Sequence, residues 1–174
     1  MTRGVWHAPC SVPDPIMNAA IDLPRLVAWL LSLPLLHDGT PMHAPIHRPE
    51  AVARVIAQAA IETDDPLLYA ALLDVFGARE SAYRPAAVGD HGRSCGAWQT
   101  PCARTPMGKG AALEQARLAV RIFRASFSGC PEHPLALYET GRCMAWGSRR
   151  MAEVRAELAV PLPDADVDPV AFTP

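Results

Sequence analysis

The chain has 174 residues; half of them are hydrophobic, a fifth are charged, and the net charge is −2. This composition is typical of a globular protein, and the length suits one domain with a sizeable core better than two. No run of Lys and Arg with interleaved aromatics occurs, which argues against nucleic acid as a partner. The apolar run at residues 27–36 is interrupted by Pro34 and is too short to be a transmembrane segment.

The first 49 residues are predicted to be an N-terminal extension. Residues 1–15 are Pro-rich and irregular, without a recognisable signal peptide, because Met1-Thr2-Arg3 is not followed by an apolar core. Residues 16–36 predict an apolar helix or a pair of helices whose apolar positions exceed one narrow stripe. Such a helix is buried in a core, in an interface with a protein partner or, less often, at a lipid surface. Residues 37–49 alternate Pro with His and read as a linker.

Residues 50–160 are predicted to form one mainly α domain. Helices are expected at residues 50–63, 66–79, 111–127, 134–140 and 148–158, and no strand has more than weak support. Asp64-Asp65-Pro66 predicts a helix start, with Asp as the N-cap and Pro in the first turn. The tail from 161 to 174 holds three Asp and four Pro and is expected to be extended. The fold class is therefore mainly α, a single helical domain with Pro-rich N- and C-terminal extensions.

Charge is distributed unevenly along the chain. Residues 66–160 carry 12 basic and 8 acidic side chains, a net charge of +4, whereas the flanks are acidic. A mildly basic domain suits an anionic polymer as its ligand.

Five cysteines allow several interpretations. Two local disulfides, Cys95 with Cys102 and Cys130 with Cys143, would fit an oxidising compartment or a virion. Pairing between the two loops is equally open, and Cys10 is left over. Reduced, buried cysteines in a cytosolic protein are the simpler alternative. A Cys/His zinc site is another, but the spacings match no common zinc module.

The segment from residue 78 to residue 100 holds the candidate site. An apolar helix delivers Glu80 to its far end, and a Gly-rich polar loop then carries Asp90 and closes on Gly96-Ala97-Trp98-Gln99. A carboxyl group beside an apolar wall and facing a polar loop is a layout typical of acid catalysis on a sugar-like ligand. A solvated Glu at a helix end before a surface loop is the alternative interpretation.

These motifs resemble the lysozyme-like superfamily, in particular soluble lytic transglycosylases and goose-type lysozymes. The resemblance rests on Glu80-Ser81, on the loop at 87–92, on 96–99 and on 137–141, and it covers about residues 66–160. The chain departs from the family pattern at Ala97-Trp98, where Leu-Met is usual, and at Glu139, where Asn is usual. The second departure adds a negative charge to this part of the chain.

The resemblance implies a peptidoglycan-cleaving glycosidase that acts on the MurNAc–GlcNAc β-1,4 linkage, with Glu80 as general acid/base. Asp90 matches the first of two acids that position water in goose-type hydrolases, whereas Pro101 stands at about the position of the second. The 1,6-anhydro product of a transglycosylase and the hydrolysed product of an inverting lysozyme therefore both stay open. Ser81, Trp98, Gln99 and Tyr138 are the predicted substrate-binding residues. A helix cap for Ser81 and a core position for Tyr138 are the structural alternatives.

No metal and no cofactor is implied. The expected partners are peptidoglycan glycan strands and a protein partner at the N-terminal apolar helix. The expected location is extracytoplasmic: periplasmic, secreted or virion-associated. A structural or binding protein that keeps a lysozyme-like body inside a larger assembly, such as a phage particle, is the alternative function.

Overall fold

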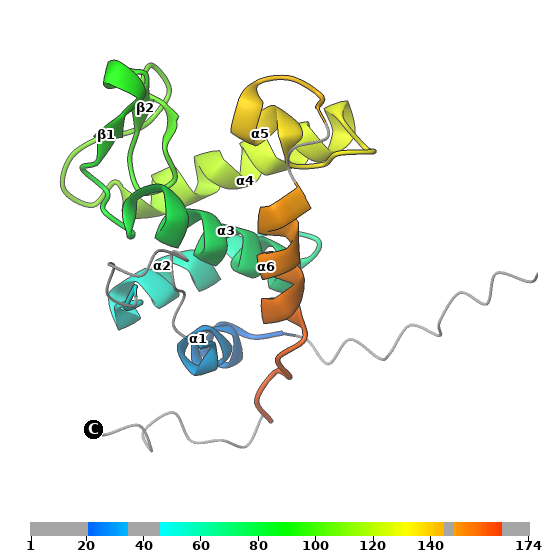
Figure 1. The fold of residues 1–174 in the computed structure, drawn as a ribbon. Coiled ribbons are helices and arrows are strands. Elements are labelled where there is room, and N and C mark those ends of the chain that lie inside the picture. Colours follow the sequence, from blue (N-terminus) through cyan, green and yellow to red (C-terminus); the bar gives the residue numbers. More distant parts are fainter. Residues whose placement is uncertain (1–20, 35–45, 145–147, 165–174) are drawn as a thin grey trace, which may run out of the picture.

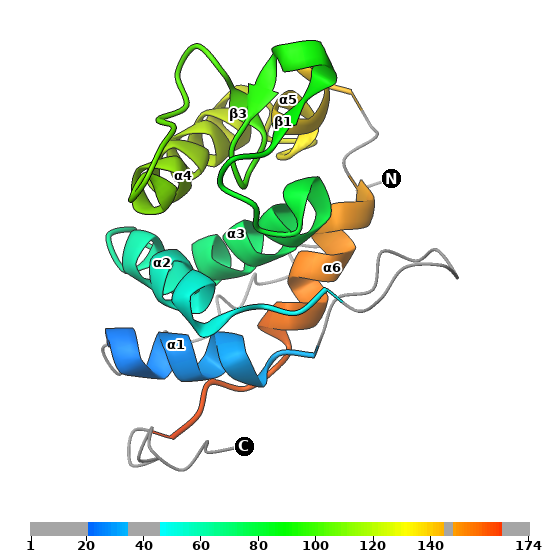
Figure 2. The same ribbon diagram turned by 90° about the vertical axis from the view of Figure 1, so that its left-hand side faces the viewer.

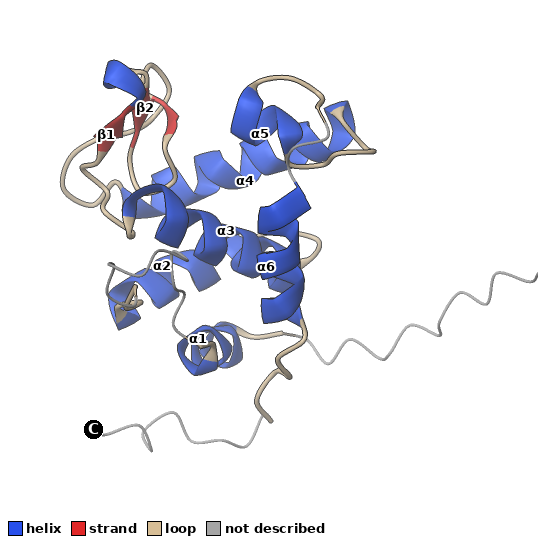
Figure 3. Ribbon diagram, in the orientation of Figure 1, coloured by secondary structure: helices blue, strands red, loops and turns tan. Residues whose placement is uncertain are grey.

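A computed structural model describes residues 21–34, 46–144 and 148–164. Within these residues the elements are α1 (Leu23–Ser32), α2 (Glu50–Ala60), α3 (Pro66–Ser81), β1 (Val88–Gly89), η1 (Asp90–Gly92), β2 (Ser94–Cys95), β3 (Thr100–Pro101), α4 (Ala112–Gly129), α5 (Ala136–Thr140) and α6 (Ser148–Leu158). Helices dominate, as Figure 3 shows, so the prediction of a mainly α fold is confirmed. None of the helices in these ranges is both long and apolar enough to cross a membrane.

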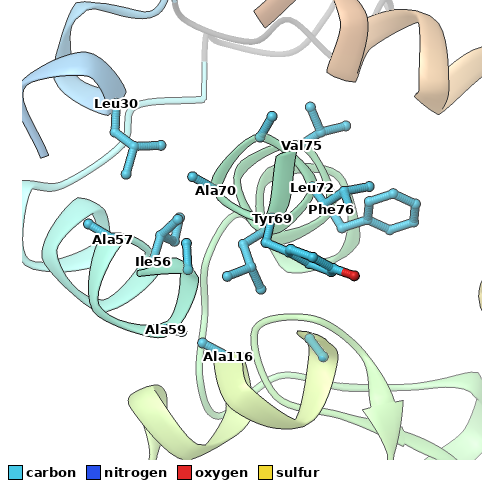
Figure 4. Close-up of a cluster of buried hydrophobic side chains, with 14 of the residues drawn as sticks. Leu30, Ile56, Ala57, Ala59, Tyr69, Ala70, Leu72, Val75, Phe76 and Ala116 are labelled. Atoms are coloured by element: carbon cyan, nitrogen blue, oxygen red, sulfur yellow. The ribbon is translucent and has the colours of Figure 1, made fainter. Parts of the chain in front are cut away.

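Helix α3 lies at the centre of the fold. Its residues 69–78 are all buried, so this helix is covered on every side. Helices α1, α2, α4 and α6 all pack against it, and Figure 4 shows Leu30 of α1, Ile56 of α2 and Ala116 of α4 facing α3. The small sheet and α5 lie on one side of α3 and α1 on the other (Figures 1 and 2). The C-terminal end of α3 is therefore supported by the core.

Local sequence accounts for the start of α3, and the loop that follows the helix accounts for a glycine near its end. The Asp65 carboxylate accepts a hydrogen bond from the backbone N–H of Leu68 at 3.1 Å, and Pro66 occupies the first turn, as predicted. The helix continues to Ser81, two residues beyond the expected end at residue 79, so Glu80 belongs to its last turn. A Cβ atom at Gly77 would lie 2.8 Å from Cδ1 of Tyr83. Glycine is needed here because the following loop folds back onto the helix.

Helix α1 packs in the same core as α2 and α3. Leu26, Trp29 and Leu30 are buried there, and the indole N–H of Trp29 donates to the carbonyl of Val160 at 2.9 Å. These apolar residues of α1 are therefore covered by the protein's own core, which is one of the alternatives that the sequence left open. The expected ends of this helix, at residues 16–20 and 35–36, lie outside the described residues.

The loop between α3 and α4 contains three short antiparallel strands that the sequence did not predict. Val88 pairs with Cys95 in β1 and β2, and Cys95 pairs with Thr100 in β2 and β3. Disulfides join Cys95 to Cys102 and Cys130 to Cys143, which is the local pairing. The first disulfide closes the loop beside β2 and β3. These four sulfurs are consequently not free to act as thiolate ligands.

A buried polar cluster joins the segment before α2 to α3 and α6. The Arg48 guanidinium contacts both carboxylate oxygens of Asp74 and donates to the carbonyl of Leu30. The Tyr83 hydroxyl donates to Asp74 at 2.9 Å. Glu157 of α6 is also buried here, and neither of its carboxyl oxygens has a hydrogen-bond partner among the described residues. Burial, reinforced by the nearby charge of Asp74, raises the pKa of Glu157 to about 10. As a carboxylic acid, Glu157 becomes a donor toward Asp74, so protonation resolves its lack of partners.

Replacing Glu157 by Gln is expected to change how stability depends on pH. In the wild type, the pKa of the Glu157 carboxyl is about 10 in the folded state and near 4.5 in the unfolded state. The stabilising contribution of the acid is therefore complete below pH 4.5 and is lost as the pH rises to 10, at up to about 1.4 kcal/mol per pH unit. Glu157→Gln should remove that slope and gain stability relative to wild type as the pH rises. Urea unfolding at pH 5, 7 and 9 measures this, with the exposed Glu114→Gln as control. Equal slopes in wild type and Glu157→Gln would contradict it.

Candidate active site

Glu80 projects from the last turn of α3 toward α6. Arg150, in the first turn of α6, donates from Nη1 to Oε1 of Glu80. The guanidinium carbon of Arg150 also lies 5.0 Å from the ring centroid of Phe76, a cation–π arrangement that fixes the cation over the core edge. The predicted catalytic carboxylate is therefore half-buried and paired with a cation, not freely solvated.

Glu139 of α5 also forms an ion pair with the guanidinium of Arg150. Its Oε1 atom is 3.5 Å from Nε of Arg150. The side chains of Glu80, Glu139 and Arg150 are 24, 17 and 29 % exposed, so solvent screens this group only in part. Burial raises the pKa of Glu139, the charge of Arg150 opposes that rise, and the negative charge of Glu80 adds to it. The structure thus brings together two carboxylates and one cation from three helices.

Tyr138 connects this group to the core and to the loop. Its ring stacks on Phe123 with centroids 4.5 Å apart and meets Phe76 edge-on at 4.8 Å. Its hydroxyl donates to the carbonyl of Trp98. Burial, together with the charge of Glu80, raises the pKa of Tyr138, so the phenol stays neutral at ordinary pH. Tyr138 thus has the contacts of a core aromatic and also lies beside the predicted acid.

Ser81 and Trp98 attach the loop to α3. The Ser81 hydroxyl donates to the carbonyl of Ala97 at 2.8 Å and accepts from the backbone N–H of Arg84 at 2.9 Å. Trp98 is 2 % exposed, and its indole N–H donates to the carbonyl of Leu73 at 2.7 Å. With its ring inside the core, Trp98 offers little surface on which a sugar could stack. In this arrangement both residues hold the loop in place next to Glu80.

Gln99 occupies the turn between β2 and β3. Its Nε2 atom donates to the carbonyl of Gly96 at 2.9 Å, and its backbone has a φ of 46°. A Cβ atom at Gly89 would lie 2.2 Å from Oε1 of Gln99, so a larger residue at position 89 would require the Gln99 side chain to move. Gln99 is half-buried and packs within the sheet loop, where part of its amide faces the loop backbone.

Among the described residues, the side chain of Asp90 hydrogen-bonds to Ser94 and not to another predicted site residue. Asp90 begins η1 at the tip of the sheet loop and is exposed, with a φ of 49°. Its Oδ2 atom accepts from the Ser94 hydroxyl at 2.5 Å. In the part of the chain that the structure describes, no hydrogen bond or ion pair joins Asp90 to Glu80 or to Glu139. The role of Asp90 in positioning water stays a prediction.

Two residues that organise the site were not found from the sequence. Arg150 comes 70 positions after its partner Glu80, and its local pattern is that of any exposed helix start. Gln115 of α4 is buried; its Oε1 accepts from Ala97 N at 3.0 Å, and its Nε2 donates to the carbonyls of Pro85 and Pro106. The signal that could have identified Gln115 is its place on the inner face of a predicted helix, where an apolar residue is usual.

A groove of about 500 Å³ lies elsewhere, between α1 and the start of α2, where Leu23, Val27 and Leu31 line it together with His47 and Arg54. It includes none of the predicted site residues. Among residues 21–34, 46–144 and 148–164, no group of three or more His, Cys, Asp or Glu side chains is placed to hold a metal ion.

Comparison with protein-family models, with curated proteins and with solved structures finds no match to this chain.

Proposed function

We propose that this protein is a peptidoglycan-cleaving glycosidase in which Glu80 is the general acid/base. The observation that carries the proposal is the placement of Glu80: a half-buried carboxylate at the end of the buried helix α3, grouped with Arg150, Glu139 and Tyr138. The motif resemblance around Glu80 supports the same assignment. The substrate would be the MurNAc–GlcNAc β-1,4 linkage, and the reaction needs no cofactor or metal.

Proton transfer in this site depends on Glu80, Glu139 and Arg150 together. Two carboxylates around one guanidinium carry a net charge of −1, and uptake of one proton makes the group neutral. For Glu80 to protonate the leaving oxygen, that proton must reside on Glu80 and not on Glu139, whose pKa is raised by burial. The neutral phenol of Tyr138 donates to the loop carbonyl of Trp98 and so ties α5 to the loop beside the site.

An extracytoplasmic location fits the two disulfides, because such bonds persist in oxidising environments. The substrate is found in the same environments, so the proposed activity agrees with a periplasmic, secreted or virion-associated protein.

The direct test is incubation of the purified, oxidised protein with purified peptidoglycan, followed by mass spectrometry of the soluble fragments. Release of disaccharide-containing fragments is the expected result. Reducing ends would identify a hydrolase, and 1,6-anhydro ends a transglycosylase. Peptidoglycan that stays insoluble, with the protein shown to be folded, would contradict the proposal.

A second function is favoured by one observation. The guanidinium of Arg150 is hydrogen-bonded to the carboxylate of Glu80. Such a pair is also expected in a protein of lysozyme-like fold that has no catalytic role and only binds peptidoglycan or assembles with other proteins, for instance within a phage particle. Such a protein would sediment with peptidoglycan or with its assembly and release no fragments. Sedimentation with intact peptidoglycan and no soluble product would favour this alternative.

A further inference from the structure

We propose that the sheet loop, residues 82–111 between α3 and α4, is a binding surface for membranes rich in anionic phospholipids. Figures 1 and 2 show this loop at the end of the molecule opposite α1, where it projects from the helices. The inference concerns this surface and not the Glu80 site, so it does not depend on the proposed glycosidase activity.

The sheet loop carries most of the excess positive charge of residues 66–160. It holds four basic side chains and one acidic side chain, a net charge of +3, whereas residues 66–160 together carry +4. The basic residues are all exposed: Arg84, Arg93, Arg104 and Lys109. The acid is Asp90, which is also exposed. A surface with this charge attracts an anionic partner.

The basic side chains of the sheet loop differ from those of the helices in their partners. Within the described residues none of the four forms an ion pair, and the side chains of Arg84 and Arg93 donate to backbone carbonyls. Six arginines outside the loop do form ion pairs with carboxylates: Arg48, Arg54, Arg79, Arg117, Arg124 and Arg150. The helical body therefore neutralises much of its own charge, whereas the charge of the loop faces solvent.

Backbone contacts hold two of these basic residues on one turn. The N–H of Cys102 donates to the carbonyl of Arg93 at 2.9 Å, and the N–H of Arg104 donates to the carbonyl of Pro101 at 2.9 Å. The Cys95–Cys102 disulfide closes the same turn. A loop fixed in this way loses little conformational freedom when its cations meet a ligand.

A buried glutamine joins the two ends of the sheet loop. Nε2 of Gln115 donates to the carbonyl of Pro85 at 2.9 Å and to that of Pro106 at 2.8 Å. Arg84 precedes the first of these prolines and Met107 follows the second. The loop therefore keeps a basic and an apolar exposed residue close to one anchoring side chain.

Exposed apolar side chains favour a lipid surface over a dissolved polyanion. Val88 is 62 % and Met107 46 % exposed, and they are two of the six exposed large hydrophobic residues among the described ranges. Cations together with apolar side chains suit a bilayer interface, where phosphate groups lie above hydrocarbon. Nucleic acid is disfavoured, because the aromatic residues of the loop, Tyr83 and Trp98, are buried and offer no stacking surface.

The experiment is sedimentation of the full, oxidised chain with vesicles of phosphatidylcholine, either alone or mixed with phosphatidylglycerol. Wild type should bind the mixed vesicles and not the neutral ones. The triple variant Arg93→Gln, Arg104→Gln, Lys109→Gln should bind the mixed vesicles about 100-fold more weakly, at about five-fold for each basic side chain. Its melting temperature checks that the loop remains folded.

A second triple variant, Arg121→Gln, Arg142→Gln, Arg155→Gln, is the matched control. It removes the same charge from three exposed arginines outside the sheet loop. Because charges more than a Debye length from the membrane are screened, its binding should stay within about three-fold of wild type.

The apolar contribution is measured with Val88→Thr and Met107→Gln combined. This variant keeps every charge and should bind the mixed vesicles about ten-fold more weakly, because less apolar surface is removed from water. Inorganic polyphosphate, added as a competitor, separates recognition of a lipid surface from recognition of phosphate alone.

Selective loss of binding in the loop triple variant and in the apolar variant, both with wild-type melting temperatures, would support the proposal. Failure of folded wild type to bind the mixed vesicles, or equal losses in the two triple variants, would overturn it. Unchanged binding by the apolar variant, with displacement of wild type by polyphosphate, would identify a dissolved polyanion as the ligand and overturn the lipid assignment. Peptidoglycan cleavage is measured separately, so each proposal can fail without the other.

Discussion

Replacing Arg48 by Met is expected to lower the free energy of unfolding by about 3–5 kcal/mol, the usual effect of removing one partner from a buried ion pair. Asp74 is fully buried, and Arg48 supplies both of its charged hydrogen bonds. Without the guanidinium, the neutral hydroxyl of Tyr83 and the protonated carboxyl of Glu157 are left beside this carboxylate, and neither of them carries a compensating positive charge. The carbonyl of Leu30 also loses the donor that ties α1 to the segment before α2.

Arg54→Met provides the matched control for this prediction. Arg54 pairs with Glu50 one helical turn away, but both side chains are more than half exposed. Pairs of this kind contribute a few tenths of a kcal/mol, so Arg54→Met should stay within about 0.5 kcal/mol of wild type. Urea unfolding at pH 7 compares the three proteins. Equal effects of the two substitutions would show that the buried pair does not hold α1, α2 and α3 together.

Replacing Glu80 by Gln is expected to slow release of peptidoglycan fragments by about 10²–10⁴-fold, the range for loss of a general acid/base. The amide keeps the size of the side chain and an oxygen that can accept from Arg150, but it cannot transfer a proton. The fold should therefore survive while the chemistry is lost. Circular dichroism and the melting temperature check the first statement.

Glu153→Gln is the matched control for Glu80→Gln. Glu153 lies on α6 and pairs with Arg79 of α3 at 3.0 Å, so it resembles the Glu80–Arg150 pair in linking the same two helices. It contacts neither Glu80 nor Glu139. Glu153→Gln should keep activity near that of wild type. A loss comparable to that of Glu80→Gln would mean that docking of α6, not the Glu80 carboxyl, limits the reaction.

Most of the helices could be predicted because their signals are local. The apolar spacing of α4 places it within two residues of the expected ends, and the Asp65-Pro66 pair marks the start of α3. Residues 148–158 form α6 as predicted. Each of these signals is read within a few turns of one helix, where side-chain spacing and capping decide the outcome.

The remaining features depend on contacts between distant segments. Each of the three strands has only two residues, too few for an alternating pattern, and the turn is closed by the Cys95–Cys102 disulfide. Arg48 lies in a stretch of Pro and His that reads as a linker, and Glu157 reads as an ordinary polar helix residue. Their burial follows from how α3 and α6 pack, which no local pattern encodes.

The candidate site likewise contains residues that local motifs predicted and residues that only the packing of distant segments reveals. Glu80 and the residues around it were identified by motif, and the structure places Tyr138 and Glu139 beside Glu80. Arg150 was not identified, because a cation opposite a candidate acid becomes visible only when α6 is placed against α3. The exposure of Asp90 likewise follows from the sheet loop that carries it, which no local pattern predicted.

The central claim, that the Glu80 carboxyl carries out glycosidic cleavage, is tested most directly by one comparison. Purified peptidoglycan is digested by wild type and by Glu80→Gln at equal concentration, with disulfides intact, and soluble fragments are quantified by mass spectrometry over time. We expect cleaved glycan fragments from wild type and a rate at least about 100-fold lower from Glu80→Gln. Equal rates from the two proteins, or no fragments from folded wild type, would contradict the claim.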